Sequence, residues 1–205
     1  MLVEKIKELR KGEIGKIVDS RISEFKKVGQ SKIDRIFSEL CFCILTANYS
    51  ASGGIKIQKS LGRGFLTLDK NELSKKLREL GHRFPKARAE YIVAARNKID
   101  EMKNTLKDLK GEELRSWFVK NIKGLGMKEA SHFLRNIGRE DYAIIDFHII
   151  DILVREGLIK RPKTLTKKRY IEIENVLREL GKKTSLELGE LDIYLWYLET
   201  GKILK

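Results

Sequence analysis

Apolar residues recur at three- and four-residue steps along most of the chain, and strand-like alternation is almost absent. The clearest sets are Ile33, Phe37, Leu40 and Ile44; Leu73, Leu77 and Leu80; Ile92, Ala95 and Ile99; and Tyr170, Ile173, Leu177 and Leu180. Each set forms one apolar stripe on an amphipathic helix. Glycine or proline breakers lie between them, at Gly53–Gly54, Gly62 to Gly64, Gly81 to Pro85, Gly124 to Gly126, Gly138, Gly157 to Pro162 and Gly181. The pattern predicts an all-α protein of about ten helices with short connections, one of them capped by Thr166.

The length and composition are those of a globular chain. With 205 residues, 41% of them hydrophobic, the sequence fits one compact domain or two small lobes. The most apolar stretch, Cys41 to Ala47, is far too short to span a bilayer. The N-terminus is charged from Glu4 onward and has no apolar signal region, so we expect an ordinary first helix and a cytoplasmic protein.

Charge indicates the kind of partner. The chain has 43 Lys and Arg against 29 Asp and Glu, a formal net charge of +14. Such an excess favours a polyanion through release of its counterions. A thermophile surface is the alternative, because 35% of residues are charged and only Gln30 and Gln58 are glutamine. That alternative explains the abundance of both signs but not their imbalance, so we favour a nucleic-acid partner.

Cys41 and Cys43 are the only two cysteines. They are too few for a four-cysteine cluster or a closed zinc site, and their spacing is poor for a disulfide. We expect both to fill the core.

Gly124-Leu125-Gly126 lies between the end of one predicted helix and the start of the next. Two glycines allow a tight hairpin and a close approach of its backbone to a partner. The following helix N-terminus offers N–H groups that suit a phosphate, and Leu125 is expected to anchor the hairpin in the core. Many helix-helix turns share this Gly-x-Gly pattern, so it is weak evidence alone.

Lys128 begins the next helix, on the face opposite its apolar residues, which are Ala130, Phe133, Leu134 and Ile137. The helix dipole disfavours a cation at this end. Lys128 is therefore either a solvated lysine or an amine that faces a ligand, and helix geometry alone favours the first.

Asp146 follows the apolar run 143–145 and precedes another apolar helix. This is an N-cap position, and a capping aspartate can also take part in catalysis. The neighbouring His148 is expected to be structural.

Phe84 precedes Pro85, which disfavours the α region for the residue before it. Phe84 is therefore expected in a turn, flanked by Arg83, Lys86 and Arg88. Its ring could stack on a base or pack beneath the turn, and the residues alone favour packing.

Three segments together resemble a known family. GLGMKEASHFLRNIG followed by YAIIDFHIID resembles the helix-hairpin-helix DNA glycosylase superfamily, and in particular the type-2 8-oxoguanine DNA glycosylases of archaea and some bacteria. LTANYSA, from Leu45 to Ala51, resembles the motif that fills the gap left by a flipped base, and LDIYLWYLETGKILK resembles the subfamily's C-terminal end. The resemblance covers Ile33 to Lys205. The chain lacks the four-cysteine iron–sulfur loop of the endonuclease III branch and the extra β-domain of the eukaryotic enzymes.

The resemblance implies a two-lobed helical helix-hairpin-helix glycosylase fold, with 1–205 as one unit and an active-site cleft between its lobes. The hairpin and the Asp loop would occupy about 121–148. By resemblance the protein is a bifunctional glycosylase and abasic-site (AP) lyase. The implied site residues are Lys128 as nucleophile, Asp146 as its catalytic partner, Phe84 and Trp196 around the extruded base, Lys205 as its reader, Asn48 in the gap, and Arg83, Gly124, Leu125 and Gly126 on DNA.

The implied chemistry requires no metal or redox cofactor, although the family hairpin can carry a monovalent cation. The expected partner is double-stranded DNA with 8-oxoguanine or abasic sites, bound by a monomer without a membrane. One alternative is a non-catalytic helix-hairpin-helix DNA-binding module, in which Lys128 and Asp146 are ordinary surface and cap residues. The other is a different enzyme, either a glycosylase for oxidised pyrimidines or a lyase acting mainly on abasic sites. A structural protein with incidental charge explains none of the three motifs.

Overall fold

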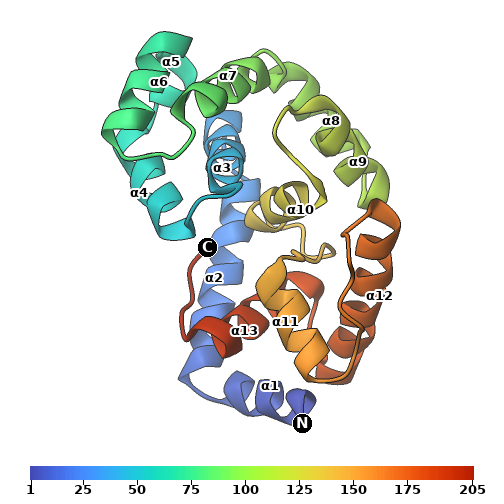
Figure 1. The fold of residues 1–205 in the computed structure, drawn as a ribbon. Helices are drawn as coiled ribbons and strands as arrows, with labels where there is room; N and C mark the ends of the chain where they lie inside the picture. Colours follow the sequence, from blue (N-terminus) through green and yellow to red (C-terminus); the bar gives the residue numbers. More distant parts are fainter. The chain divides into compact units, whose positions relative to one another are not determined.

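The computed structural model describes all 205 residues and contains thirteen helices and no strands (Figure 1). The helices are α1 (Leu2–Lys11), α2 (Glu13–Gly29), α3 (Ile33–Thr46), α4 (Ala51–Leu61), α5 (Gly64–Thr67), α6 (Lys70–Glu79), α7 (Pro85–Arg96), α8 (Ile99–Asp108), α9 (Gly111–Asn121), α10 (Met127–Asn136), α11 (Phe147–Arg155), α12 (Lys167–Thr184) and α13 (Leu188–Thr200). The all-α prediction is confirmed. The predicted number of helices was too low, partly because α5 is a single turn and too short to show periodicity.

The chain divides into two compact units. Unit 1 contains Met1–Lys27 and Leu134–Lys205, and unit 2 contains Val28–Phe133. The chain passes from one unit to the other within α2 and within α10. The predicted active-site cleft between lobes stays a prediction.

Helix α3 is the core element of unit 2, where it contacts α4, α5, α7 and α8. Nearly every side chain from Ile36 to Ala47 is buried, including the free cysteines Cys41 and Cys43. Both cysteines are core residues, as predicted, and complete burial raises the pKa of the Cys41 thiol well above its usual value.

The break predicted at Gly53–Gly54 is wrong, because both glycines lie within α4. A Cβ at Gly54 would lie 2.8 Å from Cγ2 of Thr46 and 3.1 Å from Cε2 of Phe42. Gly54 therefore allows α4 to pack closely on α3 rather than ending a helix.

The stripe predicted through Ile92, Ala95 and Ile99 crosses two helices. Helix α7 ends at Arg96, and Ile99 begins α8 after a turn at Asn97 and Lys98. The helical spacing of apolar residues continued through the turn by coincidence, and no glycine or proline marked the break.

Unit 1 is built from α1, α11, α12, α13 and the adjoining parts of α2 and α10. Helices α11 and α13 lie side by side, and α13 also contacts α1 and α12 (Figure 1). All four residues of the predicted α12 stripe are buried, and the Thr166 side chain caps the helix by accepting from the N–H of Arg169 at 3.2 Å. The break predicted at Gly181 is wrong. Helix α12 continues to Thr184, and a Cβ at Gly181 would lie 2.7 Å from the carbonyl oxygen of Leu186.

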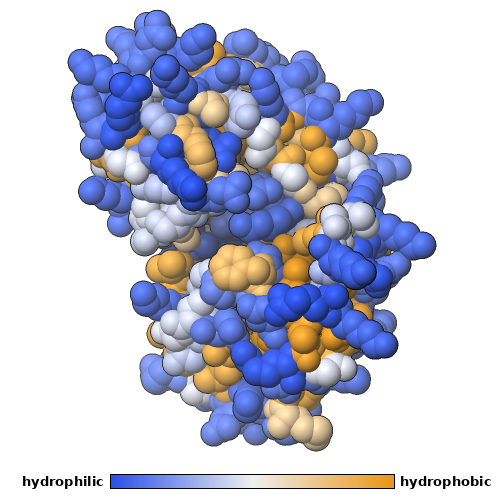
Figure 2. Space-filling model, viewed as in Figure 1, coloured by the Kyte–Doolittle hydropathy of each residue, from blue (hydrophilic) through white to orange (hydrophobic).

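Charged and polar residues cover most of the molecular face in Figure 2, with smaller apolar areas among them. Six large apolar side chains are exposed: Met1, Ile17, Phe84, Phe147, Leu158 and Leu165. None of the helices combines the length and apolar character needed to cross a bilayer. Large aromatic side chains are normally buried, so exposed ones can indicate a surface that contacts a partner. Phe84 and Phe147 both adjoin predicted site residues.

Candidate functional site

The hairpin at 124–126 has the predicted geometry. Gly124 adopts φ +89°, a conformation that disfavours residues with a Cβ, and Leu125 is buried. A Cβ at Gly124 would also lie 2.4 Å from Cδ2 of Tyr91. The turn is thus anchored by Leu125 and packed against α7, which leaves no room for a side chain at Gly124.

Lys128 lies in the first turn of α10, opposite the apolar residues of that helix, and the residues one turn further on, Ser131 and His132, are buried. Its side chain is 31% exposed, and its Nζ is 3.9 Å from Oε1 of Glu129. The other carboxylate oxygen of Glu129 accepts the N–H of Gly126 at 3.1 Å. One N–H expected to be free for a phosphate is therefore already satisfied, while those of the first turn of α10 keep no intrahelical partner. The three-residue spacing from Gly126 to Glu129 is a capping signal that sequence reasoning missed.

The segment before Asp146 is extended and is held by two side chains of α12. The hydroxyl of Tyr170 donates to the carbonyl of Ala143 at 2.7 Å and accepts the N–H of Ile145 at 3.1 Å. The Glu174 carboxylate accepts the N–H of Ala143 at 3.0 Å. The extended segment pairs with no other strand, so these side chains satisfy its backbone groups instead. They thereby fix the path of the chain toward Asp146.

Asp146 caps α11, as predicted. Its Oδ1 accepts the N–H of Ile149 at 3.0 Å, whereas Oδ2 makes no hydrogen bond within the protein. One carboxylate oxygen is thus committed to the helix and the other is available to a partner.

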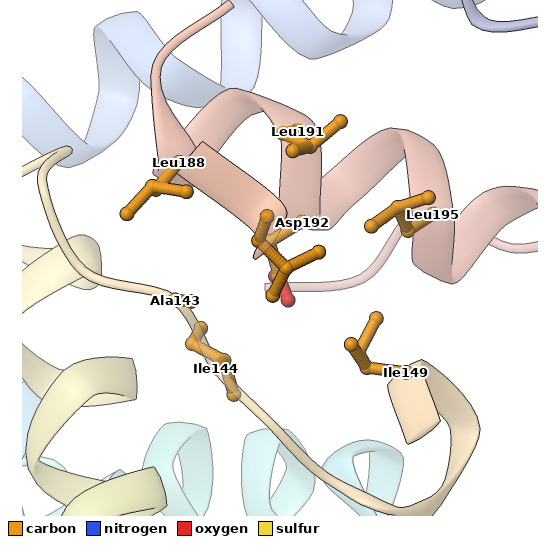
Figure 3. A pocket seen from close by; sticks show the side chains of 8 residues that line it. Ala143, Ile144, Ile149, Leu188, Leu191, Asp192 and Leu195 are labelled. Atoms are coloured by element: carbon orange, nitrogen blue, oxygen red, sulfur yellow. The ribbon is translucent and has the colours of Figure 1, made fainter. Parts of the chain in front are cut away.

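Figure 3 shows how this segment packs. Ala143 and Ile144, together with Ile149 of α11, face Leu188, Leu191 and Leu195 of α13. The space between them is too small to hold a water molecule. It is core packing that supports the Asp146 segment and not a ligand site.

Three aromatic rings follow Asp146 in unit 1. Phe147 is 64% exposed, and its ring centroid lies 4.0 Å from that of His148. The His148 ring in turn packs edge to face against the Trp196 ring of α13, with 4.8 Å between the ring centroids. Trp196 is half-buried and so is not a fully buried core residue. Its contact with His148 links it to α11, the helix that Asp146 caps.

Phe84 is the N-cap residue of α7, outside the helix as predicted. Its ring is 38% exposed, so the expectation that it packs beneath the turn is wrong. The guanidinium groups of Arg83 and Arg88 lie 5.1 and 5.7 Å from the ring centroid. The exposed ring with adjacent cations fits the stacking alternative.

The remaining predicted site residues lie at chain turns and at the C-terminus. Asn48 is exposed directly after α3, with φ +57°. Lys205 is the last residue of a non-helical tail that follows Gly201, and it is partly buried. Unit 2 carries Asn48, Arg83, Phe84, Gly124, Leu125, Gly126 and Lys128, whereas unit 1 carries Asp146, Trp196 and Lys205.

Comparison with known proteins identifies the family of this chain. A family profile described as "8-oxoguanine DNA glycosylase" matches residues 18–186. The 8-oxoguanine DNA glycosylase/AP lyase of Methanocaldococcus jannaschii is 53% identical over 207 residues, with all of both chains covered. This chain belongs to the 8-oxoguanine DNA glycosylase family.

Solved structures of relatives have the same fold. The M. jannaschii glycosylase/lyase in complex with a 15mer DNA containing 8-oxoguanine superimposes with a TM-score of 0.96 at 52% identity, covering all of both chains. The 8-oxoguanine DNA glycosylase of Thermotoga maritima gives 0.92 at 45% identity, covering 100% of this chain and 98% of that one. The helix-hairpin-helix glycosylase fold is therefore confirmed for this member of the family.

Proposed function

We propose that this protein is a bifunctional DNA glycosylase/AP lyase that excises 8-oxoguanine from double-stranded DNA in base excision repair. Membership of the family over almost the whole chain carries the proposal. The excess of positive charge supports binding to DNA phosphates. The hairpin, with its closely packed Gly124, is the proposed phosphate-contacting element, together with Arg83.

Lys128 is the proposed nucleophile. Its neutral amine attacks the sugar C1′ while the bond from C1′ to the base breaks and the base leaves with the bonding electrons. Asp146, through its unoccupied Oδ2, stabilises the cationic sugar in the transition state and accepts the amine proton. The sugar ring then opens: the C1′–O4′ bond breaks, O4′ takes up a proton, and C1′ and the lysine nitrogen form a Schiff base. The Schiff base acidifies the hydrogen on C2′, so loss of that proton expels the 3′ phosphate oxygen by β-elimination. None of these steps requires a metal or a redox cofactor.

The target base must leave the helix before this attack. Phe84 and Trp196 are proposed to stack on its two faces, and Asn48 to occupy the space it leaves. Such stacking contributes about 1–3 kcal/mol per base. The exposed ring of Phe84 and the half-buried ring of Trp196 are both suited to this role.

Base preference on defined duplexes tests this function against its alternatives. Duplexes containing 8-oxoguanine, an oxidised pyrimidine or a preformed abasic site are each incubated with excess protein under single-turnover conditions. Release of 8-oxoguanine with strand cleavage, and at least about tenfold slower release of the pyrimidine, is expected. Cleavage of the abasic duplex alone would favour a lyase, and tight binding without product would favour the non-catalytic module.

Lys205 is the proposed reader of the oxidised base. 8-Oxoguanine carries a hydrogen on N7, where guanine has only an acceptor, so an acceptor such as the terminal carboxylate distinguishes the two. A C-terminal extension past Lys205 should lower the ratio of 8-oxoguanine to guanine excision at least about tenfold. The same tag at the N-terminus is the control, and equal ratios for the two tagged proteins would exclude this role.

Gly124→Ala should lower DNA affinity about tenfold and stability by about 1–3 kcal/mol, because the new Cβ meets strain at positive φ and the Tyr91 ring. Gly157→Ala is a matched control, since Gly157 has φ +70° but nothing within 4 Å of an added Cβ. Gly157→Ala should lose stability through backbone strain but keep the wild-type DNA affinity. Fluorescence anisotropy and chemical unfolding measure the two quantities, and equal DNA affinities for both variants would contradict a role of the hairpin.

We also propose that the protein acts as a monomer in the cytoplasm, associated with the nucleoid. A monovalent cation at the hairpin is compatible with this function. Sedimentation with and without DNA tests the oligomeric state.

A further inference from the structure

Two turns of unit 2 that carry proposed DNA-contacting residues are joined by a cluster of buried side chains. The first turn, 47–49, contains Asn48, whose left-handed backbone conformation is unusual for a residue with a Cβ. Such a conformation persists only where its surroundings hold it in place. The second turn, 81–84, contains Phe84.

His82 connects the two turns through both of its ring nitrogens. Its Nε2 lies 2.9 Å from the carbonyl oxygen of Leu45, and its Nδ1 lies 3.0 Å from the backbone nitrogen of Phe84. A carbonyl only accepts and a backbone N–H only donates, so the imidazole is neutral with its proton on Nε2. With 4% of its surface exposed, this ring bonds the end of α3 to the backbone of Phe84.

Arg88 makes a second connection. It is 7% exposed, and its Nη2 donates to the carbonyl of Ala47 at 2.6 Å. The same guanidinium lies 5.7 Å from the Phe84 ring centroid, and its buried Nε has no partner in the protein. The residue directly before Asn48 and the ring of Phe84 are therefore positioned by one buried cation.

Tyr49 closes the cluster on the other side of Asn48. Its ring lies 4.3 Å from that of His82, and its hydroxyl donates to the carbonyl of Gly81 at 3.2 Å. Both neighbours of Asn48 are thus tied to the 81–88 segment.

We propose that His82 and Arg88 are positioning residues that couple the Asn48 turn to the Phe84 turn, so that filling the gap and stacking on the extruded base occur as one event. The inference rests on the roles given to Asn48 and Phe84 under the proposed function. Coupling prevents return of the base, because the side chain that fills the gap cannot withdraw independently of the ring that holds the base.

The test measures binding rather than catalysis. The duplex contains a tetrahydrofuran abasic analogue opposite 2-aminopurine, whose fluorescence reports how the gap is filled. Asn48→Ala should lose most of the wild-type signal. His82→Phe keeps a ring beside Tyr49 but loses both hydrogen bonds, and Arg88→Met loses the bond to Ala47. Both should reduce the fluorescence change to within about twofold of Asn48→Ala at saturating protein, with Arg88→Lys partly restoring it.

Ile57→Val, a cavity-forming change elsewhere in the unit 2 core, is the control for lost stability and should keep the full signal. Thermal unfolding confirms that every variant is folded at the measuring temperature. A wild-type signal in both His82→Phe and Arg88→Met would overturn the coupling, and so would an unchanged signal in Asn48→Ala. A protein that gives the expected fluorescence pattern but releases no 8-oxoguanine would retain the coupling and refute the proposed activity.

Discussion

Replacing Lys128 with glutamine is expected to lower both 8-oxoguanine release and abasic-site cleavage by at least about 10³-fold, because the side chain keeps its length but loses its nucleophilic amine. The Lys128 side chain is 31% exposed and forms no close ion pair, since its Nζ lies 3.9 Å from Glu129, so the substitution should leave stability unchanged within about 0.5 kcal/mol. Single-turnover rates on the two duplexes measure the effect.

Lys123→Gln is the matched control for this variant. Lys123 lies on the same hairpin segment, is exposed, and pairs with Glu90 at 2.5 Å. Exposed pairs of this kind contribute little to stability, so this variant should retain most of the wild-type rate and lose only a modest amount of DNA affinity. Equal losses in the two variants would indicate a general charge effect and take the nucleophile away from Lys128.

Asp146→Asn is expected to slow base excision by about 10²–10³-fold while preserving the fold. An asparagine oxygen can still accept the N–H of Ile149, so the cap on α11 remains. What disappears is the negative charge that stabilises the cationic sugar. Excision rates and chemical unfolding of the same preparations separate the two effects.

Asp146→Ala removes the cap as well and should cost about 1 kcal/mol of stability beyond the asparagine variant. If Asp146 were only a cap, the asparagine variant would excise at the wild-type rate and the alanine variant would lose activity in proportion to its stability. A slow but stable asparagine variant is the result that a catalytic carboxylate predicts.

Helical periodicity and local capping signals were sufficient to predict the fold class and the local structure at several positions. Thr166 and Asp146 were recognisable as caps because the residue type and the start of an apolar helix coincide in sequence. Leu125 was recognisable because an apolar residue between two glycines has little reason to be exposed. These signals all operate within a few residues of one another.

Predictions failed where packing between distant segments overrides local propensity. Gly54 and Gly181 were predicted to break helices, yet both lie within helices. Glycine is needed at each position because another segment approaches too closely for a side chain. Phe84 was expected to pack beneath its turn, but it is 38% exposed and its ring lies beside Arg83.

The contacts that position the site were also absent from the sequence signals. Tyr170 appeared only as one member of an apolar stripe, although its hydroxyl holds the segment before Asp146. His82 and Arg88 bond to carbonyls about forty residues away, a separation over which no periodicity carries information.

Borohydride trapping detects the Schiff base between Lys128 and the DNA sugar. Wild-type protein and Lys128→Gln are each incubated with a duplex containing one 8-oxoguanine, and the Schiff base is reduced to a stable covalent adduct. We expect an adduct with the wild type and none with the variant. Tight binding without an adduct in the wild type would contradict the lyase mechanism, and an adduct that persists in Lys128→Gln would assign the nucleophile to another residue.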